Sequence, residues 1–270
     1  RLRQTFIDYL HHLPFYGLAV LCLDDPQIQT ILEEVTRPVV TYGIDAPADV
    51  TAGAIRQEGG QTHFEVQRAG ESVTLSVTLN LPGRHNVLNA LAAIAVATEL
   101  GVPDAAIQAA LAGFQGIGRR FQIGGEIATN AGSLLLIDDY AHHPREIEPT
   151  LAAVRAGWPG RRLVVVFQPH RYTRTRALFD DFTRAFYQSD VLVVLPIYSA
   201  GERVIEGVDS GLMCRGIAAH GHKHVICEND KASTVSRLKT LLQPGDVLLT
   251  LGAGDVYRVG EKTLKALAGS

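Results

Sequence analysis

The sequence predicts an α/β protein of two domains, the second of them a doubly wound sheet. Three observations lead to this prediction. Short apolar runs alternate with helical segments along most of the chain, as in parallel βα units. Residues 50–81 replace this rhythm with apolar–polar alternation between glycine-bearing turns, which is typical of antiparallel hairpins. The length of 270 residues, with 46% hydrophobic and 20% charged residues, is enough for one large or two modest domains.

The first domain is expected to open with alternating helices and strands. These are a helix at about 3–13, a strand at Leu18–Leu23, a helix at about 25–35 and a strand at Val39–Tyr42. Asp24, Asp25 and Pro26 resemble a helix start, with an aspartate cap and a proline in the first turn, although a catalytic role for the aspartates stays open. After the hairpins we expect a helix from Asn86 to Leu100, closed by Gly101, and another from Pro103 to near Phe114.

The stretch "QGIGRRFQIGGE" holds two turn-forming glycine clusters and predicts a domain boundary near residue 118. The second domain then alternates strands with helices, apart from one mixed loop before the fourth strand. The strands are expected at Leu134–Ile137, Leu163–Phe167, Val191–Leu195, Val225–Cys227 and Val247–Leu251, and the helices at about 144–156, 173–188 and 231–242.

Polar side chains follow three of these strands. The segments are "IDDYAHHP" (137–144), "VVFQPHRYTRT" (165–175) and "LTLGAGD" (249–255). Ligands bind at the carboxyl ends of the strands in doubly wound sheets. One polar strand end is compatible with an ordinary turn, but three of them favour a binding site.

The second of these segments is rich in arginine. Arg171, Arg174 and Arg176 crowd a strand-to-helix junction, where a helix N-terminus already favours anions. Arg171 and Arg174 are three residues apart and could reach one carboxylate or phosphate together. The pattern predicts an anion site, and the alternative is a solvated basic surface.

The first segment offers Asp139, Tyr140 and His142 to the same crevice. The alternative is that Asp138 or Asp139 caps the following helix, which Pro144 would begin, while the histidines lie in a surface loop.

A third group, His85, Asn86 and Asn89, stands at the start of a first-domain helix. The two asparagines share a helix face and could read an adenine edge, or they could simply cap the helix.

Several classes of function are disfavoured. A net charge of −3 does not suggest a nucleic-acid partner, and no apolar stretch is long enough to span a membrane. Three scattered cysteines without a CxxC pair fit reduced thiols in a cytoplasm. The histidines of "HGHKH" (220–224) lack the carboxylate or cysteine pattern that would support a metal site. "GAGD" lacks the third glycine of a dinucleotide fingerprint, which disfavours an oxidoreductase, and no GxxxxGK[ST] phosphate loop occurs in the chain.

Together, the motifs "PGRHNVLNALAA", "GRRFQ", "DDYAHHP", "PHRYTRTR" and "LGAGD", in this order, resemble those of the ATP-dependent Mur ligases of peptidoglycan synthesis. The forms "DDYAHHP" and "HRYTRTR" most closely resemble those of the members that add L-alanine to UDP-N-acetylmuramate. The resemblance covers essentially the whole chain. It implies that 1–117 is the C-terminal part of a central ATP-binding domain and that 118–270 is a Rossmann-like C-terminal domain. The UDP-sugar domain, the phosphate-binding loop and the Mg²⁺ ligands would then lie outside this chain.

The resemblance also implies roles for individual residues. ATP would be bound by His85, Asn86, Asn89, Arg120 and Asp139, with Asn89 at the adenine, Arg120 near the phosphates and Asp139 on the ribose. L-Alanine would be bound by Tyr140, His142, His170, Arg171 and Arg174. No metal ligand and no complete catalytic set is expected in this chain. The alternative from another class is a non-catalytic module that binds a nucleotide or an amino acid.

Overall fold

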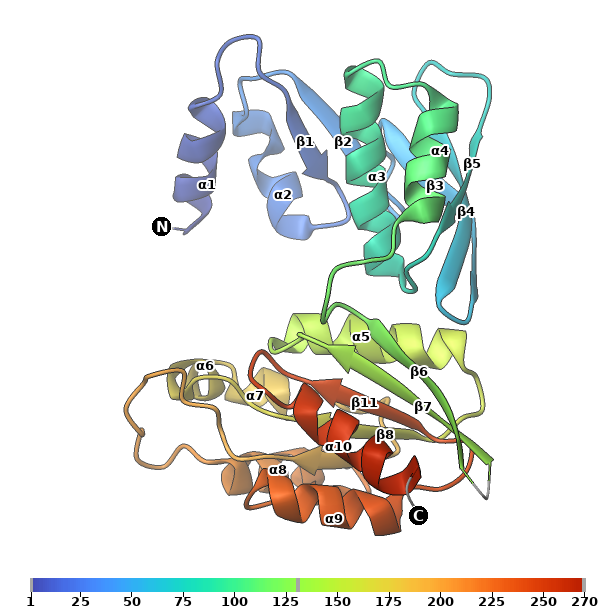
Figure 1. Ribbon diagram of the computed structural model, residues 1–270. Coiled ribbons are helices and arrows are strands. Elements are labelled where there is room, and N and C mark those ends of the chain that lie inside the picture. The colour runs from blue at the N-terminus through green and yellow to red at the C-terminus, as the bar shows by residue number, and fades with distance from the viewer. Residues whose placement is uncertain (1, 130–131, 269–270) are drawn as a thin grey trace. The chain divides into compact units, whose positions relative to one another are not determined.

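The computed structural model describes residues 2–129 and 132–268. It divides into two compact units, residues 1–115 and 116–270. The boundary predicted from the sequence follows residue 117. Both units are α/β, and each has a mixed sheet (Figure 1).

The first unit contains a five-stranded sheet in the order β1-β2-β3-β4-β5. Its strands are β1 (Ala19–Cys22), β2 (Val39–Gly43), β3 (Val50–Glu58), β4 (Gln61–Arg68) and β5 (Leu75–Leu79). The first three strands pair in parallel, and β3, β4 and β5 pair antiparallel. The parallel opening and the hairpins predicted from the sequence are therefore confirmed.

The described helices of this unit are α1 (Leu2–His11), α2 (Pro26–Ile31), the 3₁₀ helix η1 (Leu32–Glu34), α3 (Arg84–Glu99) and α4 (Asp104–Gly113). Helix α3 contributes Leu91 and Ile94 to a core that includes Phe64 and Val66 of β4. Asp25 caps α2, as predicted, because its carboxylate accepts the N–H of Gln27. Asp24 has a different role, since its carboxylate accepts backbone N–H groups from residues 44–46.

The second unit contains a six-stranded sheet in the order β10-β9-β8-β11-β7-β6. Its strands are β6 (Gln122–Thr129), β7 (Gly132–Asp139), β8 (Leu163–Phe167), β9 (Val191–Val194), β10 (Val225–Cys227) and β11 (Val247–Leu251). All neighbours pair in parallel except β6, which runs antiparallel to β7 at the edge. The bounds of β8, β10 and β11 are those predicted from the sequence.

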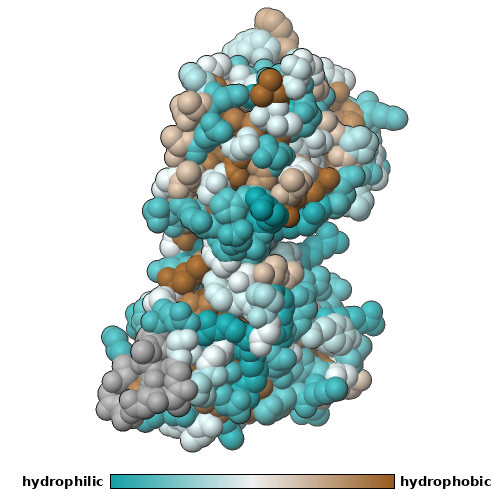
Figure 2. Space-filling model, turned by 90° about the vertical axis from the view of Figure 1, so that its right-hand side faces the viewer, coloured by the Kyte–Doolittle hydropathy of each residue, from teal (hydrophilic) through white to brown (hydrophobic). Residues whose placement is uncertain are grey.

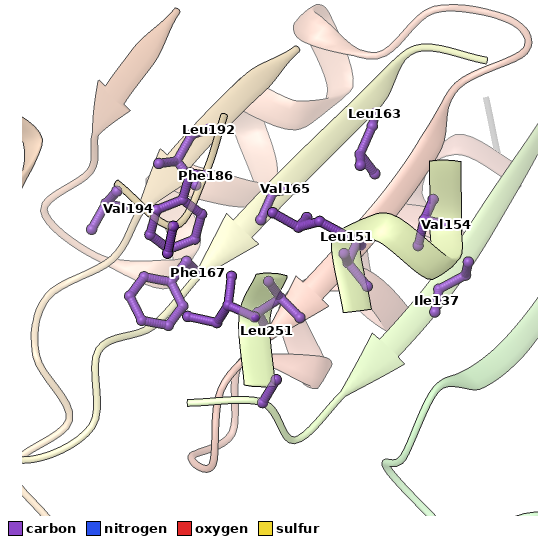
Figure 3. Close-up of a cluster of buried hydrophobic side chains, with 14 of the residues drawn as sticks. Ile137, Leu151, Val154, Leu163, Val165, Phe167, Phe186, Leu192, Val194 and Leu251 are labelled. Carbon is purple, nitrogen blue, oxygen red and sulfur yellow. The ribbon is translucent and has the colours of Figure 1, made fainter. Parts of the chain in front are cut away.

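Helices cover both faces of this sheet. They are α5 (Pro144–Gly157), α6 (Tyr172–Ala177), α7 (Phe179–Phe182), α8 (Ser210–Ala219), α9 (Lys231–Leu241) and α10 (Tyr257–Ala268). Successive strand residues point to opposite faces, so the sheet has a core on each side. Ile137 and Val165 belong to the core that α5, α7 and α8 complete, which Figure 3 shows in part. Leu136 and Val166 belong to the core completed by α9 and α10.

Two sequence-based predictions for the second unit were wrong. The glycines of "QIGGE", read as a turn, lie in β6, where the register shifts between Ile123 and Gly125. Gly125 has a φ of +99°, so the glycine serves a strand irregularity and not a chain reversal. The single helix expected over 173–188 is two short helices that break at Leu178. Helices α8 and α10 were not predicted.

The surface of the molecule is mainly hydrophilic on the face shown in Figure 2, where hydrophobic residues are scattered in small groups. This distribution is expected when the large apolar side chains are gathered in cores. Within residues 2–129 and 132–268, no helix combines the length and the apolar character needed to cross a bilayer.

Candidate functional site

The three polar segments predicted from the sequence lie side by side in the second unit. Strand β11 pairs with β7 on one side and β8 on the other, and Leu251 is in register with both Asp139 and Phe167. The segments that begin at residues 140, 168 and 252 therefore leave the sheet at one level of its carboxyl edge. This confirms the predicted meeting of the three strand ends.

A cavity of about 480 Å³ lies at this edge. It is lined by Tyr140, His142, His170, Arg171, Thr173, Arg174, Ala177 and Ala253. The size is within the range of small-molecule sites. All five residues that were predicted to bind L-alanine line this one cavity, although their role as ligand contacts stays a prediction.

Arg171 lines the cavity, and the carboxylate of Glu202 partly balances its positive charge. Its Nη1 lies 3.6 Å from Oε1 of Glu202, and its backbone φ of +72° is unusual for a residue with a side chain. Glu202 also accepts the hydroxyl of Thr173 at 2.7 Å and its backbone N–H at 3.0 Å. These hydrogen bonds, and Arg171 after them, lower the pKa of Glu202, so the carboxylate is ionised at neutral pH. Sequence reasoning did not identify Glu202 or Thr173.

Arg174 has a different environment. Among the described residues, its Nη1 makes long contacts to Nδ1 and the carbonyl of His170, at 3.4 and 3.5 Å. Among the described residues, no carboxylate forms an ion pair with Arg174. The guanidinium is half-buried and retains most of its donors for a ligand, so it can bind a carboxylate or a phosphate.

His170 lies between Arg174 and Tyr198, whose ring stacks on the imidazole at a centroid distance of 5.4 Å. Burial lowers the pKa of His170, and the neighbouring His142, Arg174 and Arg171 lower it further. The ring is therefore mainly neutral at pH 7, and the two arginines supply positive charge to the cavity.

Tyr140 and His142 form the side of the cavity that β7 supplies. Their rings are 5.2 Å apart, and His142 lies 5.6 Å from His170. The alternative that an aspartate caps the next helix is wrong. Helix α5 is capped by His143, whose Nδ1 accepts the N–H of Arg145, while Glu146 completes the capping box.

Asp139 supports the turn that precedes β6. Its carboxylate accepts the N–H groups of Phe121 and Ala141, each at 2.7 Å. Burial raises the pKa of Asp139 to about 6, against the lowering effect of these two bonds. Each oxygen retains a lone pair, so the side chain can still accept a hydroxyl group.

Asp138 faces the other way and accepts the hydroxyl of Thr250 at 2.5 Å and Nε of Arg119 at 3.1 Å. Burial raises the pKa of Asp138, and these two partners oppose the shift. Arg119 is a further residue that sequence reasoning did not single out.

The other predicted nucleotide contacts are spread over both units. His85, Asn86 and Asn89 stand in the first turns of α3, and Asn89 is exposed. Neither asparagine caps the helix, because the N-cap is Gly83 and the amide of Asn86 donates to the carbonyl of Pro82. Arg120 is exposed in the second unit.

The side chains do not suggest a metal centre. Within the described part of the chain, no group of three or more histidine, cysteine, aspartate or glutamate side chains is placed to hold an ion. The described residues therefore do not form a magnesium site made of protein side chains alone.

Comparison with known proteins gives two family matches. Residues 119–254 match the family described as Mur ligase, glutamate ligase domain, and residues 3–97 match the Mur ligase middle domain. A UDP-N-acetylmuramate–L-alanine ligase of Desulforapulum autotrophicum is 54% identical over 267 residues, which are 99% of this chain and 58% of that protein. The chain thus spans little more than half the length of this curated relative.

Solved structures of similar architecture include a UDP-N-acetylmuramate–alanine ligase of Thermotoga maritima, with a TM-score of 0.74 and 26% identity. That match covers 98% of this chain and 54% of the other. A MurF ligase of the same organism, in complex with ADP, has a TM-score of 0.73 at 19% identity and covers 98% of this chain and 57% of its own. The second of these likenesses concerns the fold alone.

Proposed function

The chain belongs to the Mur ligase family, and we propose that it is part of an ATP-dependent ligase that joins L-alanine to UDP-N-acetylmuramate. The observation that supports this best is the cavity at the carboxyl edge of the second sheet. It brings Arg171 and Arg174 together with a neutral His170, and Arg174 has no carboxylate partner among the described residues. A free amino acid with a small side chain offers mainly its carboxylate for recognition, which suits such a pair of arginines.

The proposed reaction forms an amide through an acyl phosphate. ATP transfers its γ-phosphoryl group to the lactyl carboxylate of UDP-N-acetylmuramate, and the amine of L-alanine attacks the activated carbonyl. The tetrahedral intermediate then releases phosphate and leaves the amide. The amine must be held close to the carbonyl and must have lost its proton.

Residues of this chain would orient the amino acid. Arg174 and Arg171 would bind its carboxylate, with Glu202 holding Arg171 in place. Because His170 is neutral, it adds no further charge beside the bound substrate. Tyr140 and His142 would form the opposite wall and limit the space for the side chain.

Other residues would bind ATP. Asn89 would read the adenine, with His85 and Asn86 beside the nucleotide. Asp139 would accept a ribose hydroxyl through its remaining lone pairs. Arg120, whose side chain is exposed, would approach the phosphates. Magnesium would be held by residues outside this chain.

The test uses a full-length protein that contains this chain, with UDP-N-acetylmuramate, ATP and single amino acids. Mass spectrometry should detect the amide with L-alanine and little with D-glutamate. With ¹⁸O in the lactyl carboxylate, one label should appear in the released phosphate. No amide with L-alanine, or a clear preference for another amino acid, would contradict the proposal.

The 270-residue chain alone should release no phosphate in response to L-alanine. It contains no GxxxxGK[ST] segment, so it lacks the loop that would clamp a transferring phosphoryl group. Turnover by the isolated chain would overturn this assignment of roles.

A further inference from the structure

We propose that Arg119, which does not line the cavity, is the positioning residue that holds two of its walls in place for the amino acid. The inference rests on the proposed function. The guanidinium of Arg119 contacts three groups through three different nitrogens. Nε donates to Asp138 at 3.1 Å, Nη1 to the carbonyl of Gly254 at 2.8 Å and Nη2 to the carbonyl of Gly252 at 2.6 Å.

These contacts hold the backbone on both sides of Ala253, which lines the cavity. The two carbonyls that Arg119 binds belong to the residues on either side of Ala253. A planar guanidinium presents its donors in a fixed fork, so both carbonyls are held in one orientation. The turn after β11 is thereby fixed against the end of β7, where Asp138 lies.

The same side chain also contacts the neighbouring wall, which the segment after β7 supplies. The guanidinium carbon lies 5.1 Å from the centre of the Tyr140 ring, which lines the cavity, and 4.8 Å from that of Tyr257. The backbone N–H of Tyr140 donates to the carbonyl of Arg119 at 2.6 Å. Arg119 therefore restrains Tyr140 through both its side chain and its main chain.

The backbone around Arg119 is held in an uncommon conformation. Arg119 and Phe121 have φ angles of +63° and +44°, although neither is glycine. Asp139 fixes this turn by accepting the N–H of Phe121. Residues in such conformations persist where the surroundings over-determine them, often at binding sites.

The turn after β11 is also packed from its other side. A Cβ on Gly254 would lie 2.7 Å from Oε1 of Gln168 and 3.2 Å from the ring of Tyr198. Because Tyr198 stacks on His170, a shift of this turn would be transmitted to the histidine of the cavity. The loss of Arg119 should therefore disturb both walls that it contacts and the His170 side as well.

Arg162 provides a matched control. It clamps the opposite end of β11, where its guanidinium binds both oxygens of Asp246 at 3.0 and 2.9 Å and the carbonyl of Leu241 at 2.6 Å. The two side chains are similarly exposed, at 24% for Arg119 and 28% for Arg162. Arg162 thus forms a comparable number of hydrogen bonds next to β11 but lies at the end of the strand away from the carboxyl edge.

The experiment compares Arg119→Ala, Arg119→Lys and Arg162→Ala in the full-length protein, with L-alanine and ATP varied in turn. Arg119→Ala should raise the KM for L-alanine about 10- to 100-fold, because small displacements at a site have effects of this order, and change the KM for ATP less than about 3-fold. Arg119→Lys should be intermediate, since an ammonium donates from a single point. Arg162→Ala should leave both KM values within about 2-fold of the wild type. Amide hydrogen exchange should rise at residues 252–256 and 140–142 in the Arg119 variants only.

The two proposals fail in different ways. A wild-type protein that makes no amide with L-alanine would refute the proposed function, and hydrogen exchange would still test whether Arg119 holds the turn. An active wild type in which Arg119→Lys and Arg162→Ala give the same KM for L-alanine and the same exchange would refute the positioning role. Because Arg119→Lys retains the charge and most of the side chain, it keeps the test decisive if Arg119→Ala does not fold.

Discussion

Replacing Arg174 with alanine in the full-length ligase should raise the KM for L-alanine and leave the KM for ATP nearly unchanged. Arg174 lines the cavity, and its contacts within the chain are long, at 3.4 and 3.5 Å, so its donors remain available. One hydrogen bond to a charged group contributes about 1.5–3 kcal/mol. Two such bonds to the substrate carboxylate, reduced by solvent in an open cavity, give on the order of 2–4 kcal/mol. The expected loss in kcat/KM for L-alanine is therefore about 30- to 1000-fold.

Arg171→Ala should have a smaller effect. Arg171 already faces Glu202 at 3.6 Å, and its side chain is 50% exposed, so part of its charge is balanced and screened. We expect a loss of about 5- to 30-fold for this variant, equivalent to about 1–2 kcal/mol. Arg174→Lys should recover little activity because lysine lacks the planar fork.

The assay is steady-state kinetics with each substrate varied in turn. Arg176→Ala is the control, because Arg176 lies in the same helix, is exposed and does not line the cavity. Its kinetic constants should stay within about 2-fold of the wild type. A defect of Arg174→Ala that appears only in the KM for ATP would refute the assignment of the cavity to the amino acid. An equal loss in Arg176→Ala would indicate a general effect of basic charge.

Further predictions concern the 270-residue chain itself. It should bind ATP weakly and with little dependence on Mg²⁺. In calorimetry, Asn89→Ala should weaken that binding about 3- to 10-fold. Equal ATP binding by the wild type and Asn89→Ala would count against Asn89 as the adenine contact. Burial raises the pKa of Asp139 from 3.8 to about 6, so its protonated form stabilises the fold below about pH 4 and this stability is lost as the pH rises through 6. Between pH 4 and pH 7 the free energy of unfolding of the wild type should therefore fall by about 2 kcal/mol relative to Asp139→Asn. A pH-independent difference in urea titrations would contradict this. Gly254→Ala should cost about 1–3 kcal/mol, because its Cβ would lie 2.7 Å from Gln168, whereas Gly118→Ala, with nothing within 4 Å, should be nearly neutral.

The sequence contains much of the information that locates the cavity. Buried parallel strands are short, β-branched and leucine-rich, and β8 and β11 show this pattern without interruption. Because the carboxyl ends of parallel strands share one edge, the polar residues after β7, β8 and β11 could be grouped before any contact was known. Tyr140 and Arg174 were predicted in this way, whereas His170 was predicted from the resemblance to the Mur ligases.

The partners of these residues could not be predicted in the same way. Glu202 lies 31 residues beyond Arg171 in a loop after β9, and no local periodicity links the two. Arg119 meets Gly252 and Gly254 across more than 130 residues. Such contacts depend on the order of the strands in the sheet, in which β11 lies between β7 and β8. No single segment of the sequence determines that order.

Local signals also misled where tertiary packing decides the structure. Gly124 and Gly125 suggest a turn, but they lie in β6, where the register shifts against β7. The segment after Tyr172 has no glycine or proline to mark a break, yet it divides at Leu178, and Phe182 and Phe186 on its far side are buried in the core. Helix α10 could have been predicted, because Val259, Thr263 and Leu264 recur at helical spacing and are all buried.

The most direct test of the central claim is a crystal structure of the full-length protein with L-alanine and a non-hydrolysable ATP analogue. We predict the carboxylate of L-alanine in the cavity, about 2.7–2.9 Å from the guanidinium nitrogens of Arg174, with Arg171 beside it. The adenine should lie at Asn89. A nucleotide phosphate bound to Arg174, with L-alanine elsewhere, would contradict the account.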